Sequence, residues 1–202
     1  MTKIVIIDYG MGNLRSVQKA LESVGQKALI TSDASVIESA EKMVFPGVGA
    51  FGAGMKELEQ RGLVEPIIKF IASGRLFLGI CLGLQLLFTE SEEEGLQKGL
   101  GIIKGRVKKF PDKGLKIPHM GWNRIKKVKE FPLLEDIADN TYMYFVHSYY
   151  VEPEDKAIVA TTTNHGIKFT SSIYKDNIQA MQFHPEKSQE AGLKILENFT
   201  KV

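Results

Sequence analysis

The sequence contains a single cysteine, Cys81, among 202 residues, so no intrachain disulfide can form. Long apolar runs are also absent: the longest stretch without a charged residue spans residues 76–89, which is too short to cross a bilayer. The N-terminal segment lacks the apolar core and cleavage site of a signal peptide. We therefore expect a cytoplasmic protein, in which a lone cysteine is either a packed side chain or a nucleophile.

Net charge is small as well, at +2, and a composition of 44% hydrophobic and 25% charged residues excludes disorder and fibrous structure. The charge is unevenly spread, because residues 104–129 hold ten Lys and Arg against one acid, Asp112. Such a stretch could bind nucleic acid or a phosphorylated ligand. It lacks interleaved aromatic residues for base stacking, however, and residues 124–129 alternate as an exposed strand does. We favour a solvated sheet face and expect no nucleic-acid partner.

Strands and helices alternate through the first half of the sequence. Short apolar runs predict strands at residues 3–8, 27–31, 43–45 and 76–80, and helical periodicity predicts helices at 14–24, 36–40, 55–60, 63–72 and 82–88. Asn13 is a suitable N-cap for the first helix, and Pro46 is expected to end the third strand. This alternation is typical of a doubly wound α/β fold with a mostly parallel sheet.

The second half is rich in strands instead. They are predicted at residues 102–107, 123–128, 142–151, 157–163, 168–174 and 178–183, before a terminal helix at about 189–201. No internal repeat or linker separates the halves. We therefore predict one domain over residues 1–202, with an α/β fold and a strand-rich C-terminal half.

Residues 47–52, Gly-Val-Gly-Ala-Phe-Gly, fit the glycine pattern of a dinucleotide-binding loop. They do not follow the first strand, however, and the next predicted strand ends in no acidic residue that could bind a ribose. We therefore expect no nicotinamide or flavin cofactor, and no other cofactor is indicated. The glycines are better suited to letting the backbone approach a smaller group.

Residues 79–83, Gly-Ile-Cys-Leu-Gly, are the cysteine form of the G-x-S-x-G nucleophile elbow, and they lie between a predicted strand and a predicted helix. In such an elbow Cys81 adopts a strained backbone, and flanking glycines avoid Cβ clashes. The amide of Leu82 would then point toward the oxygen of an attacked carbonyl. A cysteine buried for packing is the alternative, but the two glycines favour a nucleophile.

A base for Cys81 is offered by residues 182–186, Gln-Phe-His-Pro-Glu. His184 could accept the thiol proton, and Glu186 could orient its imidazole. His147 lies inside a predicted strand and is more typical of a core histidine. No spacing of His, Cys and acidic residues suggests a metal site.

Residues 79–85 and 182–186 together resemble the class-I, triad-type glutamine amidotransferases. Four further motifs narrow the resemblance to the glutaminase subunits of imidazole glycerol phosphate synthase: residues 8–13 (DYGMGN), 46–52 (PGVGAFG), 118–123 (PHMGWN) and 145–149 (FVHSY). These motifs run through nearly the whole chain, and no catalytic position departs from the family pattern.

The resemblance implies a role for each of several residues. It identifies Cys81 as the nucleophile, His184 as the base and Glu186 as the residue that orients the base. It further implies oxyanion binding by the amides of Val48 and Leu82, glutamine binding by Gly49, Gln85, Glu93, Ser148 and Tyr149, and a partner interface at Asn13, Trp122, Tyr144 and Lys187.

The same resemblance implies hydrolysis of L-glutamine through a thioester on Cys81. The ammonia would pass to a (β/α)₈-barrel cyclase subunit, which forms imidazole glycerol phosphate and an aminoimidazole carboxamide ribotide in histidine biosynthesis. The expected assembly is a heterodimer without a membrane or nucleic-acid partner. Two alternatives remain open: another amidotransferase, of the pyridoxal phosphate or anthranilate type, and a nucleotide-binding or regulatory module that uses residues 47–52 and the basic stretch.

Overall fold

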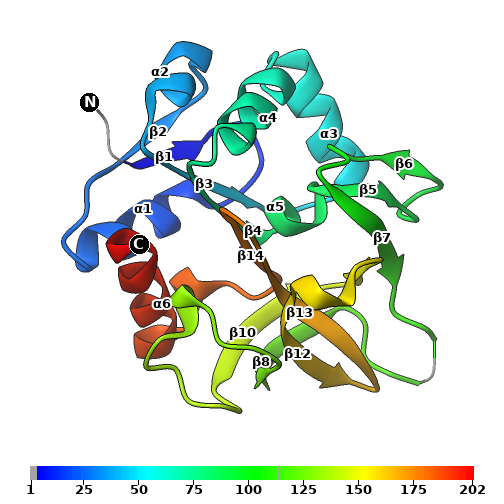
Figure 1. Ribbon diagram of the computed structural model, residues 1–202. Coiled ribbons are helices and arrows are strands. Elements are labelled where there is room, and N and C mark those ends of the chain that lie inside the picture. The colour runs from blue at the N-terminus through cyan, green and yellow to red at the C-terminus, as the bar shows by residue number, and fades with distance from the viewer. Residues whose placement is uncertain (1–3, 113) are drawn as a thin grey trace.

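The computed structural model describes residues 4–112 and 114–202, in which twelve strands form one mixed sheet and two more form a small second sheet (Figure 1). The strands are β1 (Ile4–Ile7), β2 (Ala28–Thr31), β3 (Lys42–Gly47), β4 (Leu76–Cys81), β5 (Phe88–Ser91), β6 (Gln97–Lys98), β7 (Ile103–Lys109), β8 (His119–Arg124), β9 (Lys126–Lys127), β10 (Tyr142–His147), β11 (Tyr149–Pro153), β12 (Val159–His165), β13 (Ile167–Lys175) and β14 (Ile178–Met181). The helices are α1 (Leu14–Ser23), α2 (Ala34–Ser39), α3 (Phe51–Gln60), α4 (Val64–Ala72), α5 (Leu82–Gln85) and α6 (Gln189–Lys201), with 3-10 turns at Pro132–Leu134, Lys156–Ile158 and Pro185–Lys187. Within the described ranges, none of these helices has the length and apolar character needed to span a membrane.

The N-terminal part of the large sheet is parallel, in the order β2-β1-β3-β4. All four residues of β1 are buried, and its side chains alternate between two apolar clusters. One cluster lies under α2, α3 and α4, and the other lies under α1 and α6. Figure 1 shows these two groups of helices on opposite sides of the strands. Helices on both faces of a parallel sheet confirm the predicted doubly wound α/β fold.

Strand β14 joins this parallel region to an antiparallel one. It pairs in parallel with β4, where Ala180 lies beside Gly79, and antiparallel with β13. From β13 the sheet continues through β11, β7, β5 and β6, while β12 and β9 extend from the same strand. This arrangement confirms the strand-rich C-terminal half. It also brings the chain that follows β14 next to the end of β4.

Three predicted boundaries in the first half are wrong. The helix predicted at 55–60 begins four residues earlier, since α3 starts at Phe51. Strand β3 does not end at Phe45 but continues through Pro46 to Gly47. Strand β1 pairs with β3 only as far as Val44, so no neighbour on that side needs the N–H that Pro46 lacks. The helix predicted at 82–88 stops at Gln85 as α5, and the following residues lead into β5, because a short apolar run fits a strand as well as a helix.

Two predicted strands in the second half are also divided. The strand predicted at 142–151 breaks at Ser148 into β10, which pairs with β8, and β11, which pairs with β7 and β13. The strand predicted at 123–128 starts earlier, since β8 begins at His119, and it is interrupted by Ile125. Ile125 is fully buried, so the chain turns its side chain into the core between β8 and β9. The terminal helix α6, in contrast, has the predicted bounds.

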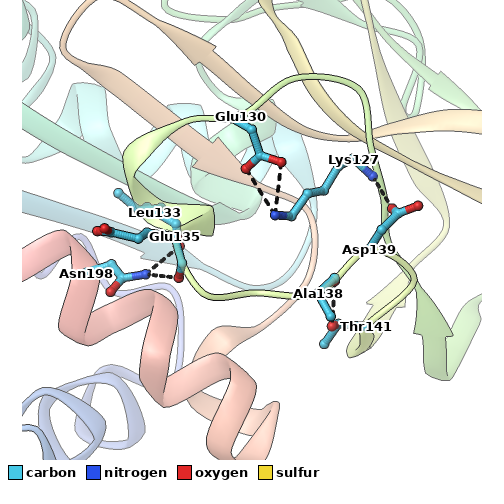
Figure 2. A network of polar contacts seen from close by, with 8 residues as sticks. All are labelled: Lys127, Glu130, Leu133, Glu135, Ala138, Asp139, Thr141 and Asn198. Atoms are coloured by element: carbon cyan, nitrogen blue, oxygen red, sulfur yellow. Dashed lines mark hydrogen bonds and ion pairs between the residues drawn. The ribbon is translucent and has the colours of Figure 1, made fainter.

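Much of the basic stretch at residues 104–129 lies on exposed strand surface. Strand β7 alternates between buried and exposed residues, with Arg106 directed outward. Arg106 Nε lies 2.6 Å from Glu90 Oε1, and Lys127 Nζ lies 3.0 Å from Glu130 Oε2 (Figure 2). Surface pairs of this kind contribute little to stability but neutralise part of the charge. The arrangement supports a solvated sheet face.

The loop at residues 130–141 is held in place by α6 and β9 (Figure 2). Asn198 Nδ2 donates hydrogen bonds to the carbonyls of Leu133 (3.2 Å) and Glu135 (2.7 Å), and the backbone N–H of Lys127 donates to Asp139 Oδ1 (2.8 Å). These bonds fix the path by which the chain enters β10. That strand ends beside the cavity described next.

Candidate active site

Cys81 lies at a sharp turn between β4 and α5. Its backbone angles are φ 54° and ψ −109°, a sparsely populated conformation for a residue with a side chain. A Cβ atom at Gly83 would overlap the carbonyl oxygen of Phe45, and one at Gly79 would lie 2.9 Å from the Cβ of Ala180. The two glycines therefore let the turn pack against β3 and β14. The predicted elbow geometry is present.

His184 and Glu186 lie on the chain that follows β14. His184 Nδ1 is 2.8 Å from Glu186 Oε1, and the two side chains are only 2% and 3% exposed. Because the ionised carboxylate only accepts, Nδ1 is the donor, and Nε2 is the ring nitrogen left for Cys81. The backbone N–H of His184 donates to the carbonyl of Tyr144 (2.9 Å), and the Ser188 hydroxyl donates to the carbonyl of His184 (2.6 Å). Hydrogen bonds therefore fix both the side chain and the backbone of His184.

The pKa of His184 reflects its neighbours. Burial alone would lower it, but negative charge on Cys81 and the Glu186 carboxylate outweigh burial and raise the pKa from 6.5 to about 10. Two polar groups also contact the sulfur: Gln182 Nε2 at 3.7 Å and the carbonyl of Val146 at 4.0 Å. The site can therefore present a sulfur nucleophile beside a protonated imidazole at neutral pH.

A cavity of about 240 Å³ opens at Cys81. It brings together eight of the residues that the sequence analysis assigned to catalysis, oxyanion binding or substrate binding, and three that it did not assign. The lining residues are Val48, Gly49, Cys81, Leu82, Gln85, Glu93, Ser148 and Tyr149, with Pro118, Val146 and His147 in addition. The predicted residues thus surround one space, although they come from four separate segments of the chain.

Two of the predicted substrate residues are already bonded within the protein. Gln85 Nε2 donates to the carbonyl of Tyr149 and to Gln182 Oε1, each at 3.0 Å. Glu93 Oε2 accepts from the backbone N–H of Phe51 at 2.7 Å, which caps α3 where the residue before it offers no side-chain cap. These bonds fix both side chains in the cavity wall.

The loop after β3 also lines the cavity, through Val48 and Gly49. Gly49 has φ +110°, a conformation that favours glycine, and Val48 is 38% exposed. A Cβ at Gly47 would overlap the hydroxyl of Tyr9, which is buried and has no hydrogen-bond partner among the described residues. Burial raises the pKa of that hydroxyl, so Tyr9 is neutral. Tyr9 therefore packs against this loop at Gly47 and makes no hydrogen bond to it.

The four residues assigned to a partner interface lie on the outside of the molecule. Asn13 caps α1 by accepting from the backbone N–H of Ser16 (3.4 Å). Trp122 is 46% exposed, and its ring packs edge-on against Tyr144, with Lys187 Nζ 5.8 Å from the Tyr144 ring centre. Three of the four therefore form one aromatic and basic surface.

Sequence reasoning missed several residues of this region. Met120 and Tyr142 extend the exposed apolar surface, and the alternation of β8 away from the buried His119 would have identified Met120. Gln182, fully buried against Cys81, was part of a quoted motif but received no role. His147 is the buried strand histidine that was expected, and it also lines the cavity. No group of three or more potential metal ligands occurs in residues 4–112 and 114–202.

Comparison with known proteins identifies the family of this chain. The sequence profile described as "Glutamine amidotransferase class-I" matches residues 5–202. The chain is 54% identical to "Imidazole glycerol phosphate synthase subunit HisH" of Geobacter sulfurreducens over 100% of both chains. It is also 54% identical to the protein of that name in Aquifex aeolicus, over 98% of this chain and 96% of the relative.

Solved structures extend the likeness to the fold. A crystal structure of a glutamine amidotransferase superposes with a TM-score of 0.76 at 18% identity, covering 97% of this chain and 98% of that one. The structure of PurLQS from Thermotoga maritima gives a TM-score of 0.76 at 17% identity, covering 100% and 99%. The chain therefore belongs to the class-I glutamine amidotransferases and, among them, to the family of HisH subunits of imidazole glycerol phosphate synthase.

Proposed function

We propose that this chain is the glutaminase subunit of an imidazole glycerol phosphate synthase. It hydrolyses L-glutamine to glutamate and ammonia and passes the ammonia to a cyclase subunit for histidine biosynthesis. The observation that carries the proposal is the strained Cys81 turn opening into the cavity, with the buried His184–Glu186 pair beside it. Cys81, His184 and Glu186 are the proposed catalytic residues.

The reaction starts when the Cys81 sulfur attacks the carbon of the glutamine side-chain amide. A C–S bond forms, and negative charge moves to the amide oxygen. His184 gives its Nε2 proton to the leaving nitrogen, so that ammonia departs as the C–N bond breaks and a thioester remains. Water then attacks the thioester and gives a proton to His184, and glutamate leaves as the sulfur is restored. Glu186 holds the imidazole in position by accepting from Nδ1 in both steps.

The negative oxygen needs two donors. Leu82 is the first residue of α5, so its backbone N–H has no partner within the helix and is available. Val48 supplies the second N–H once the loop around Gly49 is turned toward the cavity. Losing one such donor typically lowers the rate about 10²–10³-fold. The loop is therefore the proposed point at which the partner controls the reaction.

The substrate is held in the proposed scheme by the cavity wall. Gly49, Ser148 and Tyr149 offer backbone groups, and Gln85 and Glu93 offer side-chain oxygens. The proposed partner is a (β/α)₈-barrel cyclase that docks on Asn13, Trp122, Tyr144 and Lys187 and receives ammonia without its release to water. We also infer a single domain over residues 1–202 and a cytoplasmic location.

The test is to measure glutamate release from glutamine by three samples: the chain alone, the chain with the cyclase subunit, and the complex with its nucleotide ligand bound. The rate should rise at each step, and a glutamine-directed electrophile should label Cys81. Equal rates in the three samples would refute control by the partner. Absence of glutamate release in all three would refute the glutaminase itself.

A further inference from the structure

A chain of hydrogen bonds leads away from the Cys81 sulfur into the protein. Gln182 Nε2 donates to the sulfur at 3.7 Å, and Gln182 Oε1 accepts from Gln85 Nε2 at 3.0 Å. The same Gln85 nitrogen donates to the carbonyl of Tyr149 at 3.0 Å. Gln182 and Gln85 are 0% and 5% exposed, so water does not replace these bonds. The Tyr149 carbonyl, on the cavity wall, is therefore linked to the nucleophile.

The chain continues from that carbonyl through two histidines. His147 Nδ1 lies 2.8 Å from the Tyr149 oxygen, and His147 Nε2 lies 2.9 Å from His119 Nδ1. His119 Nε2 in turn lies 3.0 Å from Asn123 Nδ2. Both imidazoles are buried, and Asn123 is partly exposed on β8. The sequence of contacts thus runs from the cavity to the surface.

The donor and the acceptor in each bond between Tyr149 and Asn123 follow from the groups at the two ends of this chain of hydrogen bonds. A carbonyl only accepts, so His147 Nδ1 carries a proton and its Nε2 accepts. At the other end, the Asn123 amide is fixed because its oxygen accepts from the backbone N–H of Arg124 (2.8 Å) and its nitrogen donates to the carbonyl of Asn164 (2.9 Å). His119 Nε2 therefore accepts from Asn123, and His119 Nδ1 donates to His147. The Tyr149 carbonyl at one end and Asn123 at the other therefore each require both neutral rings to carry the proton on Nδ1.

The surroundings are consistent with neutral rings. Burial lowers the pKa of His119 to about 4 and that of His147 to about 3. A second proton on either ring would place two N–H groups opposite each other. The arrangement is therefore stable at neutral pH in one protonation state only.

We propose that His119 and Asn123 are positioning residues for glutamine hydrolysis, because they hold His147 in the tautomer that fixes the Tyr149 carbonyl in the cavity wall. The inference rests on the proposed glutaminase function. It also links that wall to β8, since Asn123 directly follows Trp122 on the proposed partner surface. A shift of β8 on docking would then move the outer end of the same hydrogen-bonded chain.

If His119 had only a structural role, its substitution would affect activity only through the packing of its ring. Its ring packs against Phe145 (4.8 Å between centroids) and is stacked on His165 (4.2 Å), and the same cluster includes Phe110 and Phe169. His119→Phe keeps an aromatic ring in this cluster and removes both nitrogens. Phe110→Leu disturbs the cluster and leaves the hydrogen bonds in place, so it is the matched control.

The experiment measures kcat and KM for glutamine in the complex with the cyclase, together with Tm. His119→Phe should raise KM about tenfold, the size expected when the buried hydrogen bond to His147 is lost, with a smaller change in kcat. His119→Asn, which keeps an N–H near the position of Nδ1, should recover part of that loss. Asn123→Leu should raise KM about threefold, and the double variant should equal His119→Phe alone, because Asn123 acts through His119.

Two kinetic outcomes would overturn the inference. One is a folded His119→Phe variant with unchanged KM, and the other is a Phe110→Leu variant with the same loss of Tm and the same rise in KM. Histidine ¹⁵N NMR gives a readout that does not depend on activity: in the unmodified chain both rings should carry the proton on Nδ1. An Nε2 proton on His119 would refute the proposed chain of hydrogen bonds, even if the His119→Phe variant failed to fold. Absence of glutamate release from the unmodified complex would instead refute only the proposed function.

Discussion

The two regions of the large sheet supply the candidate site in different ways. The parallel region provides backbone: the strained turn at Cys81 and the glycine loop after β3, each held by close contacts that exclude a Cβ. The antiparallel region, together with the small second sheet, provides side chains held by hydrogen bonds: His184 and Glu186 follow β14, and His147 ends β10. Volume therefore limits substitution in the first region, whereas loss of a donor or acceptor limits it in the second.

The largest effect is expected at the residue where both regions meet. Cys81→Ala should lower glutamine hydrolysis by at least about 10⁴-fold, because the proposed nucleophile is removed. The unfolding free energy should change little, since the substitution removes one sulfur atom that borders a cavity. The measurement is the rate of glutamate release together with urea unfolding. A double variant with His184→Ala should be scarcely worse than either single variant, because the residues act as one unit.

A smaller loss is expected at Glu186, the residue proposed to orient the base. Glu186→Gln keeps the shape of the side chain but replaces the acceptor for His184 Nδ1 with a group that can also donate. The rate should fall less than for Cys81→Ala, because in a serine-protease triad the loss of the orienting acid costs about 3 × 10⁴ in rate, against about 2 × 10⁶ for the nucleophile. A rate loss equal to that of Cys81→Ala would indicate that Glu186 does more than orient the imidazole.

Two glycine substitutions test how the volume of an added Cβ changes the free energy of unfolding. Gly83→Ala should destabilise the fold by about 3 kcal/mol, because the added Cβ overlaps the backbone carbonyl of Phe45. Gly52→Ala is the matched control: it lies in α3, and its Cβ would meet only the flexible end of Gln97. That change should be neutral or stabilise by up to about 1 kcal/mol. Equal losses of unfolding free energy in the two variants, measured by urea unfolding, would contradict the statement that volume limits substitution in the parallel region.

The raised pKa of His184 predicts an alkaline limit. A base whose pKa is raised from 6.5 to about 10 in the folded state stabilises that state fully below pH 6.5 and loses the contribution as the pH rises through 10. Glutamine hydrolysis should therefore fall about tenfold per pH unit above pH 10, as the proton donor is lost. In Cys81→Ala the leading cause of the rise is absent, and NMR titration should give His184 a pKa well below 10.

The smallest effect is expected at the rim of the proposed partner surface. Lys187→Ala removes an exposed cation 5.8 Å from the Tyr144 ring centre and should weaken binding of the cyclase about fivefold. The basal rate of the chain alone should stay the same. Trp122→Ala, measured by the same calorimetric titration, should weaken binding more, because a large exposed aromatic ring is the typical anchor of an interface.

The parallel region was the more predictable of the two from sequence. Its strands are short apolar runs, and Cys81 lies between two glycines in a recognisable motif. The division of residues 142–151 at Ser148 could not be seen, because an apolar alternating run carries no sign of which sheet it joins. The bonds of Gln85, Gln182 and His119 were equally hidden, since they join residues far apart in the chain.

Strand β14 has a consequence for synthesis of the protein. It is inserted between β4 and β13, and the residue that completes the nucleophile's surroundings, His184, follows Cys81 by 103 residues. While the chain is growing, the first four parallel strands can associate before β14 exists, and at that stage the sulfur has no imidazole beside it. The proposed reactive pair therefore forms only with the last long-range strand pairing, so a truncated or stalled chain carries a thiol without its proposed base.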